Sequence, residues 1–148
     1  MEKTNWFVVF VLWFAGIAAA MQFAKFSVAF DFLGNQYNVT PFWIGLSLSI
    51  VGLIGLIFGI TVSIYISRIG QNKILLISLL LGVIVSVVQA LQPVFPILFL
   101  SRIVEGISHL GIVVTAPIIM IIISSKKHHS IVMGLMKIRG VYWLLFYL

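Results

Sequence analysis

The stretch SRIVEGISHLG, residues 101–111, places an arginine, a glutamate and a histidine inside one long apolar run. That run extends over residues 96–123, which is more than the roughly 20 mostly apolar residues that a helix needs to cross a bilayer. Charged side chains at such depth are rare, and they usually face the interior of a helix bundle or a water-filled cavity. The stretch therefore predicts a membrane helix with one polar face turned away from lipid.

The composition of the whole chain indicates a membrane protein as well. Hydrophobic residues make up 62% of the 148 residues, charged residues only 8%, and the mean hydropathy is +1.24. Globular domains carry roughly 25% charged residues, so this composition excludes a soluble domain. The net charge of +6 does not indicate nucleic-acid binding, because the basic residues lie between apolar runs and not in one patch. The absence of cysteine excludes disulfides, thiolate metal sites and cysteine nucleophiles.

Four apolar runs are long enough to cross a bilayer, and none shows the alternation typical of membrane strands. They cover residues 6–30, 41–66, 74–91 and 96–123. The first run could pass for a signal peptide, but it is longer than the usual core of roughly 7–15 residues and further spans follow. We therefore expect an all-α membrane protein whose residues 1–148 form a single, incomplete transmembrane domain.

The last segment, residues 130–148, fits a fifth span badly. It would carry Lys137 and Arg139 near its middle, where each charge costs about 2.5–3.5 kcal/mol on the insertion scale. The segment is a partial fifth helix, lies at the membrane interface, or is unrelated sequence that replaces a natural continuation.

Basic residues in the short connectors predict the orientation in the membrane. One set of connectors contains Lys3, Arg68, Lys73, Lys126 and Lys127. The alternate set, residues 31–40 and 92–96, contains no lysine or arginine. We therefore expect a multi-pass protein of the plasma (inner) membrane, in contact with the lipid bilayer, whose N-terminus is cytoplasmic.

Arg102, Glu105 and His109 share one face of their helix. At 100° per residue they fall within an arc of about 60°, and Gly106 lies on the same side. We interpret them as part of a solute or proton path, with Arg102 and Glu105 paired. The alternative is a structural Arg–Glu pair that fixes helix packing, next to a hydrogen-bonded His109.

Lys25 is the single charged residue inside the first run. It either extends its amine to the outer interface or faces a central cavity and attracts an anion. In the second case Lys25 and Arg102 outnumber Glu105 inside the membrane, which favours a small anionic solute.

A line of glycines marks the second run. Close packing between membrane helices relies on small residues, because they let two backbones approach each other. The glycines that share this face are Gly45, Gly52, Gly55 and Gly59. They predict a packing surface that needs a partner helix, which would come from the missing remainder of the protein or from another copy of the chain.

No motif indicates an enzyme. The sequence contains no phosphate-binding glycine loop, no zinc-protease motif and no serine-hydrolase motif. It predicts neither a cofactor nor a metal site.

Two motifs resemble the major facilitator superfamily. The loop YISRIGQNK resembles its signature G-x-x-x-D-R-x-G-R-R-K in Arg68, Gly70 and Lys73, whereas Ser67 replaces the aspartate. The stretch quoted at the start is similar to the fourth-helix pattern R-x-x-[QE]-G in Arg102, Glu105 and Gly106. The stretch FAKFSVAF looks like the family's first helix with a basic residue facing the cavity, and here that residue is Lys25.

The resemblance covers residues 6–135, and it implies the first part of a transporter built from two six-helix halves. It implies a substrate- or proton-linked charge at Arg102 with Glu105 as its partner, and a cytoplasmic gate made by Ser67, Arg68, Gly70 and Lys73. Two other hypotheses stay open: a small membrane protein that does not transport and assembles through the glycine face, and an inactive product of a truncated or frameshifted gene.

Overall fold

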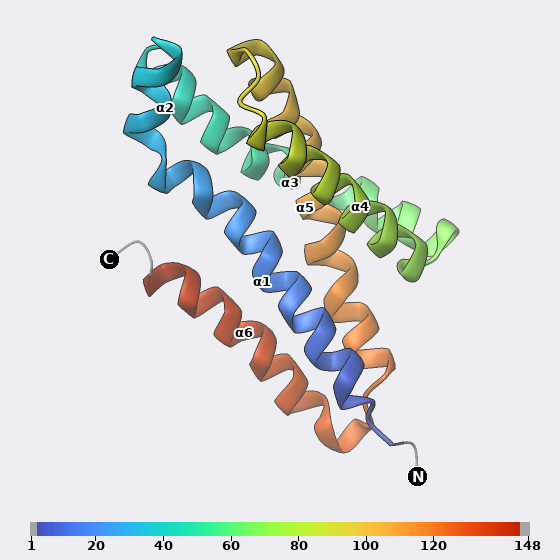
Figure 1. Cartoon of the computed structure of the whole chain (residues 1–148). Helices are drawn as coiled ribbons and strands as arrows, with labels where there is room; N and C mark the ends of the chain where they lie inside the picture. Colours follow the sequence, from blue (N-terminus) through green and yellow to red (C-terminus); the bar gives the residue numbers. More distant parts are fainter. Residues whose placement is uncertain (1–2, 146–148) are drawn as a thin grey trace.

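The computed structural model describes residues 3–145 and the side chains of residues 3–137. The chain folds into a bundle of α-helices, and no strand occurs among the residues described (Figure 1). In chain order the elements are α1 (Trp6–Val28), α2 (Phe30–Tyr37), α3 (Pro41–Ile69), α4 (Gln71–Ala90), α5 (Phe95–Ile122), the 3₁₀ turn η1 (Lys126–His128) and α6 (His129–Leu145). Residues 146–148, the end of the predicted fifth segment, lie outside the described residues.

Four helices of the described part are long and apolar enough to cross a membrane. They are α1, α3, α4 and α5, with 23, 29, 20 and 28 residues. The predicted all-α membrane protein with four spanning helices is thereby confirmed. The 17 residues of α6 make a helix of about 25 Å, shorter than a hydrocarbon core of about 30 Å.

α6 lies alongside α1 (Figure 1). The indole Nε1 of Trp13 in α1 donates a hydrogen bond of 3.0 Å to the carbonyl oxygen of Leu135 in α6. Lys137 is exposed, and the side chain of Arg139 lies outside the described residues. α6 therefore packs against the bundle alongside α1.

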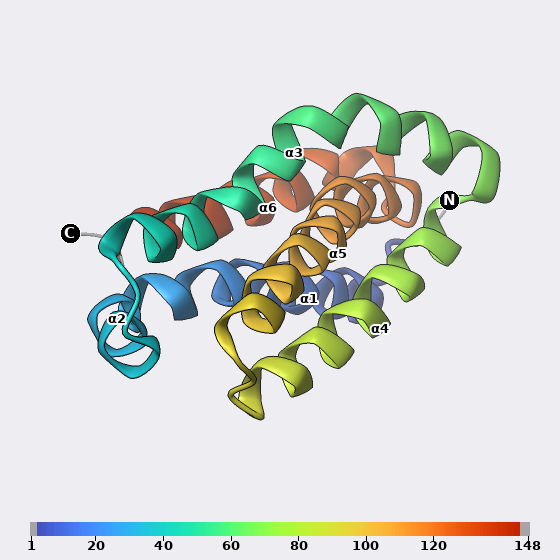
Figure 2. The ribbon, with the colours of Figure 1, turned by 90° about the horizontal axis from the view of Figure 1, so that it is seen from above.

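α5 is the central helix of the bundle. It packs against α1, α3, α4 and α6, and Figure 2 shows it between them. Within an 18-residue apolar stretch of α5, 56% of the residues are buried. In the corresponding stretches of α1, α3 and α4 the buried share is 17–22%. The other helices present much of their surface outward, which suits contact with lipid.

Two connectors are shorter than the sequence predicted. The predicted loop 67–73 is reduced to Gly70, because α3 continues to Ile69 and α4 begins at Gln71. Gly70 has a φ of 95°, a conformation that side chains disfavour, so it can reverse the chain within one residue. The predicted outer loop 31–40 is mostly the short helix α2, which ends at Asn38 in the left-handed conformation.

The glycine face of α3 does not pack within this chain. A Cβ added at Gly45, Gly52, Gly55 or Gly59 would meet no described atom within 4 Å. Gly106 of α5 differs, because a Cβ there would come within 2.7 Å of Ile54 Cδ1 and 3.2 Å of Val51 Cα. The close contact between α3 and α5 thus uses Gly106, and the predicted partner of the α3 face is not among the described residues.

The connectors gather at two opposite ends of the bundle. At one end Gln36 of α2 donates a hydrogen bond of 3.2 Å to Gln92 in the α4–α5 connector. At the other end the amide of Asn5 donates to the carbonyl of Ile123 at 3.3 Å, next to η1. Figure 1 shows α2 and the N-terminus at these opposite ends.

This arrangement predicts that Asn35 and Lys127 lie on opposite sides of the membrane. Both residues are exposed, and the native chain has no cysteine that would interfere with labelling. In Asn35→Cys and Lys127→Cys variants, a membrane-impermeant maleimide added to intact cells should label one position and not the other. Labelling of both positions from the same side would contradict the arrangement of the spans.

Candidate functional site

Arg102 is fully buried where α5 meets α1 and α3. Its Nε donates to the carbonyl oxygen of Ser47 in α3 at 3.1 Å, and its Nη1 donates to that of Gln22 in α1 at 3.3 Å. Its Cζ lies 4.0 Å from the ring centre of Phe26, also in α1. Because a guanidinium presents several donors in fixed directions, this one side chain holds three helices together.

Glu105 is fully buried next to Arg102 and is its ion-pair partner. Its Oε1 lies 2.6 Å from Nζ of Lys25 in α1, and its Oε2 accepts a hydrogen bond of 2.8 Å from Nε2 of Gln89 in α4. The carboxylate therefore joins α1, α4 and α5. The three charged groups leave one positive charge in excess.

His109 lies one helical turn further along α5. Its Nδ1 is 3.0 Å from the carbonyl oxygen of Ala19 in α1. A carbonyl oxygen can only accept, so Nδ1 carries the proton and donates. In the structure His109 thus makes a contact between α1 and α5.

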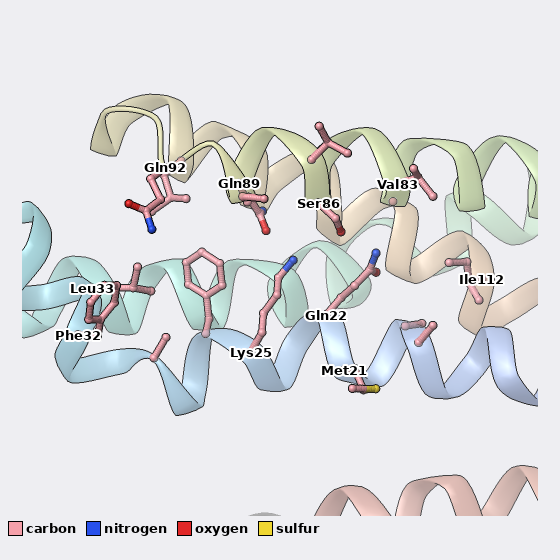
Figure 3. Close-up of a pocket in the computed structure, with 18 of the residues that line it drawn as sticks. Met21, Gln22, Lys25, Phe32, Leu33, Val83, Ser86, Gln89, Gln92 and Ile112 are labelled. Atoms are coloured by element: carbon pink, nitrogen blue, oxygen red, sulfur yellow. The ribbon is translucent and has the colours of Figure 1, made fainter.

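A cavity of about 860 Å³ opens between α1, α2 and α4. Gln22 and Lys25 of α1 line it, and Ser86 and Gln89 of α4 line it from the other side. Figure 3 shows these four side chains pointing into the space between the two helices. Most other lining residues are apolar, and neither Arg102 nor the other polar residues of α5 are among them.

Residues of α2 and of the α4–α5 connector line one end of the cavity. Tyr37 lines this end, next to the hydrogen-bonded Gln36 and Gln92. Desolvation raises the pKa of Tyr37 above its usual value, so its phenol remains neutral at physiological pH.

The four residues of the predicted gate lie at the junction of α3 and α4, and none lines the cavity. Arg68 and Lys73 are exposed. The hydroxyl of Ser67 donates to the carbonyl oxygen of Ile64 at 2.6 Å. The structure therefore brings together Lys25, Arg102 and Glu105, and it places the gate residues apart from them.

None of the motifs quoted from the sequence includes Ser86, Gln89 or Gln22. A signal for them exists, because Gln22 precedes Lys25 by three residues and Ser86 precedes Gln89 by three. Such spacing puts each pair on one face of its helix, and polar pairs within apolar spans are candidates for a site.

Comparison with known proteins identifies the family. The sequence model of the Major Facilitator Superfamily matches residues 12–138. This chain belongs to the Major Facilitator Superfamily. The match extends to residue 138, slightly beyond Leu135, where the resemblance of the motifs ends.

The arabinose-proton symporter of Bacillus subtilis (strain 168) is a curated relative. It is 33% identical to this chain over 105 residues, which cover 68% of the chain and 22% of the symporter. The chain thus spans less than two thirds of the length of this relative. No solved structure matches the chain significantly.

The contacts of Arg102 predict that its loss destabilises the bundle. Arg102→Leu should lower the free energy of unfolding by about 3–5 kcal/mol, because it removes one partner of a buried ion pair and the links to α1 and α3. Arg68→Leu, at the exposed end of α3, should change it by less than about 0.5 kcal/mol. Unfolding of the detergent-solubilised chain, followed by circular dichroism, measures both values. Equal stability of the two variants would show that Arg102 does not hold the helices together.

Proposed function

We propose that this chain forms the N-terminal part of a secondary transporter for a small polar solute. The observation that carries the proposal is the cavity of about 860 Å³ between membrane-spanning helices, into which Lys25 points. In transporters of this superfamily, solute crosses the membrane as two halves rock around a site near the bilayer midplane. Membership of the superfamily supports transport and not catalysis.

Two observations support two different classes of solute. The relative is named an arabinose-proton symporter, which supports a sugar carried together with protons. The positive charge in excess among Lys25, Arg102 and Glu105 supports an anionic solute. Of these three groups only Lys25 lines the cavity, so we assign contact with the solute to Lys25.

Arg102 and Glu105 then act through Lys25. Glu105 holds the amine of Lys25 at 2.6 Å, and Arg102 holds Glu105 against the backbone of α1 and α3. His109 would support this arrangement by joining α5 to Ala19 of α1.

The proposed transporter lies in the plasma (inner) membrane with its N-terminus in the cytoplasm. Lys3, Lys126 and Lys127 support this orientation, because they lie at one end of the bundle and lysine is enriched on the cytoplasmic side. The α3–α4 junction with Arg68 and Lys73 would face the same side as a gate. Labelling of Lys127→Cys from outside the cell would exclude this orientation.

Uptake by a completed transporter tests the function. For this test, the chain is fused in frame to the part of the Bacillus subtilis symporter that follows the matched region. A fluorescent protein fused to the C-terminus reports membrane insertion. Cells expressing it should accumulate radiolabelled arabinose, and a protonophore should abolish the accumulation. Lys25→Met should lower uptake at least tenfold, because it removes the solute-facing amine.

The matched control for this experiment is Lys127→Met, an exposed lysine outside the cavity, which should leave uptake unchanged. Full uptake by an inserted Lys25→Met variant would remove Lys25 from the solute path. Absence of uptake by the inserted, unsubstituted protein would argue against transport of arabinose.

A second candidate function is assembly without transport. It is favoured by the glycine face of α3, whose Gly45, Gly52, Gly55 and Gly59 meet no described atom within 4 Å. Small residues on an open face suit a close approach of another membrane helix.

Crosslinking in membranes tests this second candidate. Gly55→Leu should abolish a crosslinked dimer of the chain and leave its thermal stability unchanged, because Gly55 has open space around it. Gly106→Leu should lower the thermal stability, because its side chain would collide with Ile54 and Val51 of α3. A dimer that persists in Gly55→Leu would contradict assembly through this face.

A further inference from the structure

Three exposed lysines from distant parts of the sequence lie at one end of the bundle. Lys126 and Lys127 belong to η1, and Lys3 precedes α1. The residues next to them are joined, because the amide of Ser125 donates a hydrogen bond of 2.9 Å to the hydroxyl of Thr4. Figure 1 shows the start of α1 beside the turn that leads into α6. The fold therefore brings the three lysines to one surface.

Further hydrogen bonds hold the two segments of chain together. The hydroxyl of Thr4 lies 3.1 Å from that of Ser125 and 2.9 Å from Nδ1 of His128. The amide of Asn5 donates to the carbonyl oxygen of Ile123 at 3.3 Å. These contacts fix the backbone that carries the lysines, so the positive charges are kept close together by tertiary structure.

No acidic side chain of the described part balances these charges. Every ion pair among the described side chains involves Glu105, which is buried in the middle of α5. Asp31 lies in α2, at the opposite end of the bundle. Glu2 is outside the described residues. Within the described chain the three lysines therefore repel one another and attract an anion.

Apolar side chains begin immediately beside the lysines. The ring centre of Trp6, in the first turn of α1, lies 5.3 Å from that of His128, and Trp6 is 36% exposed. Phe7 and Phe10 of α1 and Ile122 of α5 are exposed as well. Tryptophan is enriched at membrane–water interfaces. Because the surface changes from cationic to apolar at the start of α1, it matches a ligand with an anionic head and apolar chains, and not a soluble anion.

We propose that Lys3, Lys126 and Lys127 form a binding site for the head group of an anionic phospholipid. The acyl chains of this lipid lie along the exposed aromatic side chains of α1. Lysine amines near a membrane surface attract anionic lipids, and salt screens the attraction. The phosphate also screens the lysines from one another, so the bound lipid strengthens the contact between the N-terminal segment and η1. The site is separate from the cavity and does not depend on the proposed function.

Native mass spectrometry of the intact chain, released from detergent micelles, tests the site. The probes are dioleoylphosphatidylglycerol, which is anionic, and dioleoylphosphatidylcholine, which has the same acyl chains and no net charge. From an equimolar mixture the chain should retain about tenfold more of the anionic lipid. A higher concentration of ammonium acetate during incubation should reduce this preference.

Two matched double variants locate the binding. Lys126→Gln/Lys127→Gln should reduce the retention of phosphatidylglycerol about tenfold, because it removes two of the three charges. Arg68→Gln/Lys73→Gln removes the same charge at the α3–α4 junction, where both residues are exposed, and should leave the retention unchanged. Lys126→Arg/Lys127→Arg keeps the charge and should keep the binding. Circular dichroism verifies that every variant is folded.

Equal retention of the two lipids by the unsubstituted chain overturns the site, whatever the variants do. Unchanged retention of phosphatidylglycerol in the folded Lys126→Gln/Lys127→Gln variant also overturns it. An equal loss in the two glutamine variants shows that the total charge and not this surface governs binding, which overturns it as well. Displacement of phosphatidylglycerol by an equal concentration of inorganic phosphate shows a site for a soluble anion and excludes a lipid site.

Thermal unfolding in nanodiscs measures the effect of the lipid on the fold. The melting temperature of the chain should be higher in discs that contain phosphatidylglycerol than in discs of phosphatidylcholine alone. This difference should disappear in Lys126→Gln/Lys127→Gln and persist in Arg68→Gln/Lys73→Gln. A difference of the same size in both variants contradicts a stabilising lipid at this surface.

Discussion

The buried ion pair of Arg102 and Glu105 is the interaction on which the rest of the bundle depends. Both side chains are fully buried, and removing charges from water is costly unless each finds partners. The two groups reach those partners on three neighbouring helices: the Ser47 and Gln22 carbonyls, and the side chains of Lys25 and Gln89. In a membrane, where apolar surfaces gain little by packing against one another, such polar contacts specify which helices surround α5.

This central pair also determines what the cavity presents. Glu105 orients the amine of Lys25 and the amide of Gln89 from opposite walls, although Glu105 itself does not line the cavity. The charged groups behind the wall therefore position the polar groups at its surface. A charge that is essential to a transporter can thus act without touching solute, which is the role that we propose for Arg102.

The sequence predicted the spanning helices well because crossing a bilayer imposes a length and a composition on each segment. The predicted run 41–66 is α3, and 96–123 is α5, with ends that differ by few residues. The connectors were predicted less well. Polar residues and turn formers do not reveal that the connector predicted at residues 31–40 is itself largely helical, or that Gly70 alone can join α3 to α4.

The sequence by itself determined that this chain is a helical membrane protein, that Arg102 and Glu105 share a helix face, and that they avoid lipid. These properties follow from local spacing and from the cost of charge in hydrocarbon. Only the tertiary structure decided that Lys25 meets Glu105 across 80 residues of chain, and that Gln22 and Gln89 face one cavity. It also left the glycine face of α3 without a neighbour among the described residues. Contacts between helices depend on their rotation and crossing, and no periodicity within a single helix encodes which neighbour its face will meet.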